Sequence, residues 1–143
     1  MKYVVFKASG DTFGVDIQSA VSIEKILPIT RVPLAPSYLR GIINLRGEII
    51  PVIDLSRALE QSTSEESAGF KNIVIIKRED YKIGLLIDSD VSIIDIDDNL
   101  VQKDVSNLSE VDKAYISGIV KYENQIINIL NTVKLTTPER AVI

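Results

Sequence analysis

The amino-acid sequence predicts an all-β fold with one or two short helices, built as two similar five-stranded antiparallel barrels packed together. The large aliphatic residues are mostly β-branched, with 23 Ile and 14 Val against 12 Leu, and such residues favour strands. Ten short runs typical of strands are separated by turn residues. The first five runs resemble the last five, which indicates an internal repeat.

The expected strands fall into two groups. The first five cover residues 3–6, 13–17, 21–26, 41–45 and 48–55, and the second five cover 72–76, 81–87, 91–96, 115–120 and 125–130. Between the groups, residues 61–69 read QSTSEESAG, a small and polar segment typical of a linker. A short helix is expected over residues 54–61, with Asp54 or Ser56 as its N-cap, and another over residues 131–140.

The two halves align with each other. Residues 3–26 match residues 73–96 at an offset of 70 with nine identities, and residues 38–55 match residues 115–132 at an offset of 77. The sequence therefore divides into repeats over 1–60 and 70–143. Because a unit of about 60 residues buries little surface alone, we expect the repeats to pack as one domain, and terminal strands can exchange between the barrels. The continuous apolar runs at 3–6 and 72–76 suit strands buried on both faces, as at a junction between barrels.

The composition excludes several classes of function. The chain has no Cys and no His, which removes disulfides, thiol nucleophiles, imidazole bases and Cys/His zinc sites. A net charge of −4 argues against nucleic acid as a partner. No apolar run approaches the roughly 18 residues of a membrane span and the N-terminus does not resemble a signal peptide, so a cytoplasmic location without membrane insertion is expected. The glycines are isolated, the acidic cluster at 95–104 lacks calcium-loop spacing, and no cofactor or metal is expected.

Two-residue turns are expected between the fourth and fifth strands of each half. The first reads Leu45-Arg46-Gly47-Glu48, and the second has no copy of the Arg46 charge. Arg46 is either a solvated surface arginine or an interface anchor, a role for which arginine is well suited. Pro51 predicts an edge strand or a bulge.

Residues 41–55, GIINLRGEIIPVIDL, resemble the signature of the CheW-type coupling proteins of bacterial chemotaxis. The segments FGVDI, YKIGLLIDSDVSIIDI and YISGIVKYENQIINILN are similar in looser form to other family segments, so the resemblance covers residues 1–143 as a single domain. It implies two SH3-like barrels and a non-catalytic adaptor that joins the cytoplasmic tips of chemoreceptors to the regulatory domain of the histidine kinase CheA. Such an adaptor is peripheral to membrane receptor arrays through its partners.

The resemblance also implies a receptor-binding surface in the groove between the barrels, with the arginine of the NLRG turn at its centre. The resemblance implies that this surface comprises Arg46, Gly41 and Asn44 from the signature, and Ala20, Ser22 and Glu24 from the segment after FGVDI. Ser22 stands where many members carry an acid. Glu24 lies two residues on, on the same strand face, and whether it replaces that acid stays open. The kinase contact is expected at exposed barrel ends and apolar edges.

Two rival functions stay open from the residues alone. The chain could be a small carboxylate-dependent enzyme, or a β-barrel that binds a ligand in an internal cavity. A pair of buried acids converging in a pocket would favour the enzyme.

Overall fold

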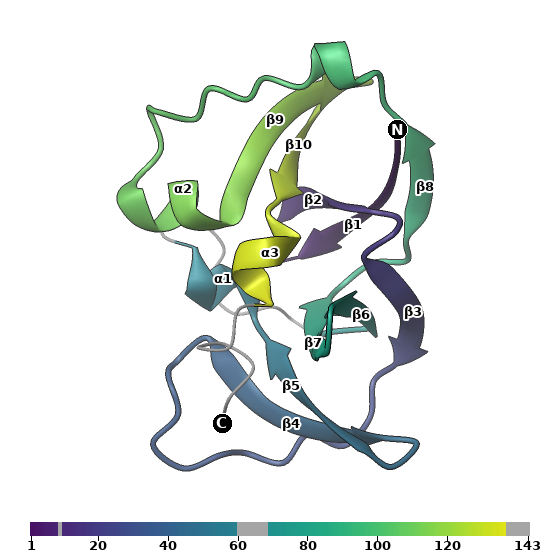
Figure 1. The fold of residues 1–143 in the computed structure, drawn as a ribbon. Coiled ribbons are helices and arrows are strands. Elements are labelled where there is room, and N and C mark those ends of the chain that lie inside the picture. Colours follow the sequence, from purple (N-terminus) through teal and green to yellow (C-terminus); the bar gives the residue numbers. More distant parts are fainter. Residues whose placement is uncertain (9, 60–68, 137–143) are drawn as a thin grey trace.

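The computed structural model describes residues 1–8, 10–59 and 69–136 and has two five-stranded sheets, drawn in Figure 1. All ten expected strands are present. The first sheet runs in the order β8-β1-β2-β10-β9 and the second in the order β3-β6-β7-β5-β4. The strands of the first are β1 (Lys2–Ala8), β2 (Asp11–Asp16), β8 (Ser92–Asp95), β9 (Ile116–Tyr122) and β10 (Gln125–Leu130), and those of the second are β3 (Ala20–Lys25), β4 (Leu39–Leu45), β5 (Glu48–Ile53), β6 (Asn72–Arg78) and β7 (Tyr81–Ile87).

The two sheets have the same architecture and each draws strands from both sequence repeats. When β1–β5 are matched in order with β6–β10, the strand order of one sheet reproduces that of the other. Strands β1 and β2 join β8–β10, while β6 and β7 join β3–β5. The segment around residues 61–69 therefore separates the repeats and not the sheets; its residues 61–68 lie outside the described part of the chain.

The sheets are not wholly antiparallel, which corrects the sequence-based expectation. Strand β2 pairs with β10 in parallel, and β5 pairs with β7 in parallel. Both pairings join strands of different repeats, so no hairpin dictates their direction. Pro51 was expected at an edge or a bulge, and that expectation is wrong, because β5 lies between β7 and β4. The parallel ladder to β7 begins at Val52, so Pro51 lies just before it, and the missing N–H of the proline does not interrupt it.

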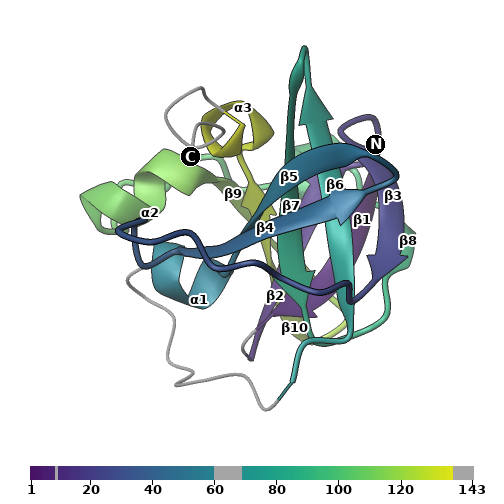
Figure 2. The same cartoon turned by 90° about the horizontal axis from the view of Figure 1, so that it is seen from below.

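Each sheet closes on itself into a barrel. The backbone of Thr30, after β3, pairs with Ile42 in β4, and Gln102, after β8, pairs with Ile119 in β9. These bridges join the outer strands of each sheet, and in Figure 2 β4 and β5 cross β6 and β7 steeply, as strands of a small barrel do. Closure removes the open edges on which such short sheets would otherwise aggregate.

The core has three parts that explain the continuous apolar runs. Val4 and Phe6 of β1 and Val74 and Ile76 of β6 point into a cluster shared by both barrels. Their neighbours along each strand fill the barrel interiors, with Tyr3 and Val5 in the first and Ile73 and Ile75 in the second. Strands β1 and β6 are thus buried on both faces, which confirms their expected place at the junction.

Short helices follow the last strand of each repeat. Asp54 caps α1 (Leu55–Ala58) and Asn131 caps α3 (Thr132–Leu135). The capping residues are equivalent, since the backbone N–H of Asp54 donates to Tyr38 and that of Asn131 donates to Tyr115. The sequence placed both helices and the Asp54 cap; residues 60–61 of the first expected helix and 137–140 of the second lie outside the described residues.

Two further elements were not expected. One is a 3-10 turn η1 (Asp98–Leu100), and the other is α2 (Glu110–Tyr115), capped by the side chain of Ser109. Helix α2 begins in residues 97–114, a segment of the second repeat that is seven residues longer than its counterpart at 27–37. Within the described residues no helix is long and apolar enough to cross a membrane.

Candidate functional site

The hairpin between β4 and β5 presents Arg46 at its tip. Arg46 and Gly47 both have positive φ, at 50° and 90°, which is the two-residue turn that suits the twist of a β-hairpin. The side-chain Oδ1 of Asn44 accepts a hydrogen bond of 2.9 Å from the backbone N–H of Gly47. Asn44 therefore shapes the turn, and the Arg46 side chain is left 71% exposed.

Arg46 forms a bidentate ion pair with Glu24. Its Nη2 lies 3.2 Å from Oε2 of Glu24, and its Nη1 lies 3.5 Å from Oε1. Glu24 belongs to β3, the outer strand at the other edge of the second sheet, so the pair spans the closure of the barrel. The structure thus brings together two residues that the sequence singled out, and Glu24 supplies the acid opposite the turn arginine.

Ser22 supports this arrangement from the same strand. The pKa of the Glu24 carboxyl lies below its ordinary value because it accepts a hydrogen bond from Arg46 and, secondly, one from the Ser22 side chain. Hydrogen bonds to the charged form lower a carboxyl pKa, so Glu24 is ionised at neutral pH. Ser22 therefore orients the acid that pairs with Arg46.

A second ion pair flanks the turn. Oε1 of Glu48 lies 2.8 Å from Nζ of Lys82, and the hydrogen bond from Lys82 lowers the pKa of Glu48. Glu48 is therefore paired with Lys82 of β7 and not with Arg46, which is paired with Glu24. The turn carries two separate charge pairs instead of one shared network.

Gly41 and Ala20 lie farther from the turn. Gly41 has a φ of 151°, and a Cβ built on it would meet the backbone O of Thr30 at 2.3 Å. Its role in the structure is close packing at the bridge that closes the barrel. Ala20 begins β3 and pairs with Ile76, and a register shift separates it from Ser22.

Exposed apolar side chains lie on the strand that carries Glu24 and on its counterpart β8, and the sequence pattern did not reveal them. Val21 and Ile23 of β3 are 52% and 40% exposed, and Ile93 of β8, the counterpart of Ile23, is 61% exposed. The alternation of apolar and polar residues in 21–26 gives the strand two faces but does not say which one is covered. Strands β3 and β8 are the outer strands of their sheets and follow one another along one side of the molecule in Figure 1. Such an exposed apolar surface is typical of protein contacts.

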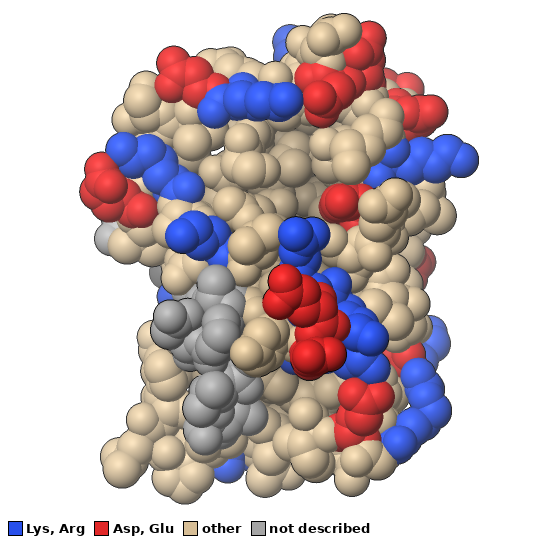
Figure 3. Space-filling model, viewed as in Figure 1, with Lys and Arg blue, Asp and Glu red and all other residues tan. Residues whose placement is uncertain are grey.

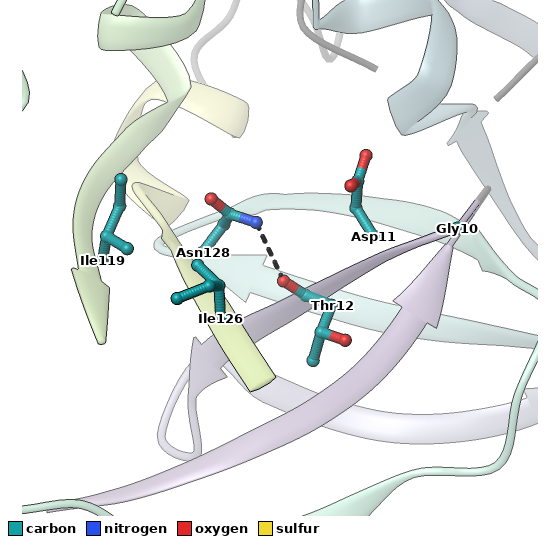
Figure 4. Close-up of a pocket in the computed structure, with 6 residues that line it drawn as sticks. All are labelled: Gly10, Asp11, Thr12, Ile119, Ile126 and Asn128. Atoms are coloured by element: carbon teal, nitrogen blue, oxygen red, sulfur yellow. Dashed lines mark hydrogen bonds between the residues drawn. The ribbon is translucent and has the colours of Figure 1, made fainter. Parts of the chain in front are cut away.

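The cavity drawn in Figure 4 offers little support for the rival enzyme. A pocket of about 460 Å³ is lined by Gly10, Asp11, Thr12, Ile119, Ile126 and Asn128 (Figure 4). Asp11 is the single acid in that lining, and burial raises the pKa of its carboxyl. Nδ2 of Asn128 donates to the backbone O of Thr12 at 3.1 Å, so this amide joins β10 to β2. The pocket therefore lacks the second carboxylate that acid–base hydrolysis needs.

The charged side chains on the face drawn in Figure 3, and the side chains among the described residues that could bind a metal, do not gather into one site. Over the face drawn in Figure 3, Lys and Arg are interspersed with Asp and Glu without a continuous basic surface. Among the described residues, no group of three or more acids, His or Cys is placed to hold a metal ion. Two acids of the cluster at 95–104 have local partners instead: Asp97 caps η1, and Asp98 pairs with Lys103.

Comparison with known proteins agrees with the fold. A family model described as CheW-like domain matches residues 2–139. The chain belongs to the CheW-like family. Chemotaxis protein CheW of Treponema pallidum is 33% identical over 138 residues, covering 92% of this chain and 79% of that protein. Chemotaxis protein CheW of Bacillus subtilis is 32% identical over 133 residues, covering 91% and 83%.

A solved crystal structure has the same fold as this chain. The crystal structure of the scaffolding protein TtCheW from Thermoanaerobacter tengcongensis superposes with a TM-score of 0.83 at 30% sequence identity. The match covers 99% of this chain and 91% of that one. The two-barrel architecture derived above is therefore that of a CheW scaffold.

Proposed function

We propose that this chain is a non-catalytic chemotaxis scaffold that couples the cytoplasmic tips of chemoreceptors to the histidine kinase CheA. The observation that carries the proposal is the pair formed by Glu24 and Arg46, which holds a largely exposed guanidinium at the hairpin tip. Membership of the CheW-like family and the scaffold named by the structural relative support it.

The receptor contact is assigned to Arg46 and the adjoining outer strands. A receptor tip carrying acidic side chains would meet the planar donor fork of Arg46, while Val21 and Ile23 offer exposed apolar area on β3. Glu24 holds the guanidinium in one direction, so less side-chain entropy is lost on binding. Ser22 and Asn44 act on this contact through Glu24 and the turn, and Gly41 and Ala20 hold the strands behind it.

The kinase contact is assigned to a different part of the surface. A coupling protein must hold two partners at once, and the two fused barrels provide separate ends for this purpose. Within an array each contact can be modest, because linked binding sites raise the effective concentration of their partners.

The proposal is tested with three purified components. The chain is mixed with the regulatory domain of CheA for gel filtration, and with receptor-containing membranes for co-sedimentation. The proposal predicts a stoichiometric complex with the kinase domain, and kinase that sediments with the membranes only when the chain is present. Absence of the kinase complex, or kinase sedimentation that does not depend on the chain, would refute the coupling role.

A further inference from the structure

The ion pair between Glu48 and Lys82 joins the starts of two strands of the second barrel. The parallel ladder of β5 with β7 begins at Val52 and Gly84, so Glu48 and Lys82 come before it along their strands. Both residues line a cavity of about 160 Å³ between these strand starts, and Nζ of Lys82 lies 2.8 Å from Oε1 of Glu48. The ion pair therefore links β5 to β7 ahead of the first pair of their ladder.

Glu48 also lies close enough to Arg46 to interact with its charge. A single residue separates the two on the hairpin, and Arg46 is one of the groups that lower the pKa of the Glu48 carboxyl, after Lys82 and Lys77. The side chain of Glu48 is 58% exposed, so packing restricts its direction little. Without Lys82, Glu48 would therefore be free to compete with Glu24 for the same guanidinium.

The pair between Arg46 and Glu24 is of a kind that a rival acid can weaken. The arginine side chain is 71% exposed, and its nitrogens lie 3.2 and 3.5 Å from the carboxylate oxygens, which is longer than most charge-assisted hydrogen bonds. Exposed ion pairs of this kind are weak. The pair between Glu48 and Lys82 is shorter, so each of the two acids has a cation of its own.

We propose that Lys82 is a positioning residue for the receptor contact, because by binding Glu48 it leaves Arg46 to Glu24 alone. This role rests on the proposed function, in which the direction of the Arg46 guanidinium decides receptor binding. Loss of Lys82 frees Glu48, which then draws the guanidinium away from β3. Lys82 acts through Glu48 and needs no contact with the receptor itself.

A purely structural role for Lys82 makes a different prediction. In that case the ion pair only ties β5 to β7, and removing either partner breaks the same link. Under the positioning role, removing Glu48 together with Lys82 removes the competing acid and restores the pair between Arg46 and Glu24. The double variant Lys82→Met/Glu48→Gln therefore distinguishes the two roles.

The test combines an NMR titration of the side-chain carboxyl groups with co-sedimentation on receptor-containing membranes. The groups that lower the pKa of Glu24 are Arg46 and Ser22, so a change at Lys82 reaches Glu24 through Arg46. Lys82→Met should raise the pKa of Glu24 and weaken receptor binding by about threefold, as expected when an exposed ion pair is disturbed. The pKa and the affinity should both return to the wild-type values in Lys82→Met/Glu48→Gln and in Lys82→Arg, which keeps the charge.

The matched control is Lys77→Met. Lys77 lies opposite Lys82 in the ladder of β6 with β7 and lowers the pKa of Glu48 less than Lys82 does, so its loss should leave the Glu24 titration and receptor binding as in the wild type. An unchanged Glu24 pKa or unchanged receptor binding in Lys82→Met, no recovery in the double variant, or an equal effect of Lys77→Met would overturn the positioning role. A wild-type chain that does not sediment with the receptor would overturn the proposed function instead, and the Glu24 titration alone would then decide whether Lys82 directs Arg46.

Discussion

Arg46 and Glu24 lie 22 positions apart in the chain, and their side chains meet at 3.2 Å across the closure of the second barrel. The guanidinium comes from the β4–β5 hairpin of that barrel and the carboxylate from its opposite outer strand. With Arg46 71% exposed, the pair stabilises the fold little, since exposed ion pairs are worth about 0.2–1 kcal/mol. Its main effect is to fix the direction in which the arginine points.

The pair predicts how the carboxyl of Glu24 titrates. Because the hydrogen bond from Arg46 is the largest cause of its lowered pKa, Arg46→Ala should raise the pKa of Glu24 toward the ordinary value of 4.5. In the wild type the folded-state pKa lies below the unfolded one, so the pair stabilises the fold above about pH 4.5 and loses that effect as pH falls through the folded-state pKa. An NMR titration of the side-chain carboxyl groups, in the wild type and in Arg46→Ala, measures the pKa of Glu24.

Glu48 provides the internal control for this titration. Its pKa is lowered mainly by Lys82, with Arg46 the smallest cause, so it should move little in Arg46→Ala. Equal shifts of Glu24 and Glu48, or an unchanged Glu24, would show that the ion pair is not formed in solution.

Gly41→Ala should destabilise the fold strongly. An added methyl group would lie 2.3 Å from the backbone O of Thr30, at a φ of 151°. We expect the free energy of unfolding to fall by about 3 kcal/mol or more, because unfavourable backbone strain and a steric clash add together. Equilibrium unfolding in urea measures the change.

Gly47→Ala is the matched control for Gly41→Ala. Gly47 also has a positive φ, of 90°, but no atom lies within 4 Å of the added methyl group. The expected loss is about 1–2 kcal/mol, the cost of the left-handed backbone alone. Equal losses in the two variants would contradict the assigned role of Gly41 at the barrel closure.

Asp54→Ala should cost more than the equivalent change Asn131→Ala. Both residues cap a helix, but besides its capping bond from the backbone N–H of Ser56, Asp54 accepts a hydrogen bond from the Oγ of Ser56 and lies beside Arg40. We expect a loss of about 3 kcal/mol for Asp54→Ala and about 1 kcal/mol for Asn131→Ala. Thermal unfolding of the two variants compares them directly, and a larger loss for Asn131→Ala would refute the charge role of Asp54.

Local patterns predicted the strands, the turns and the two helices α1 and α3, because their causes lie within a few residues. The Asp54 cap and the positive φ of Gly47 and Asn124 follow from residue types at fixed positions. The internal repeat went further and predicted two units of one design. It carried this information because each repeat keeps glycine where packed side chains of neighbouring strands leave little room for a Cβ, as at Gly14 and Gly84.

The remaining features depend on contacts between distant segments. The parallel pairings of β2 with β10 and of β5 with β7 join strands of different repeats, and no turn between them encodes the direction. The exposed face of β3 depends on its being an outer strand, so the alternation of Val21, Ser22 and Ile23 did not reveal it. Helix α2 begins in the longer segment at 97–114 of the second repeat, where its main signal is the single cap at Ser109.

The most direct test of the account reverses charges at the ion pair and measures co-sedimentation with chemoreceptor membranes. Arg46→Glu should keep a normal circular dichroism spectrum, since the tip is exposed, and should lose at least about tenfold in affinity. Glu123→Arg, at the equivalent position of the other hairpin with a φ of 47°, should bind as the wild type does.

The double variant Glu24→Arg/Arg46→Glu separates a binding role from a structural one. It restores opposite charges across the barrel closure but places the negative charge at the tip. The account predicts that this variant folds and still fails to sediment with the receptor. Normal sedimentation of Arg46→Glu, or recovery in the double variant, would contradict the claim that Arg46 itself contacts the receptor.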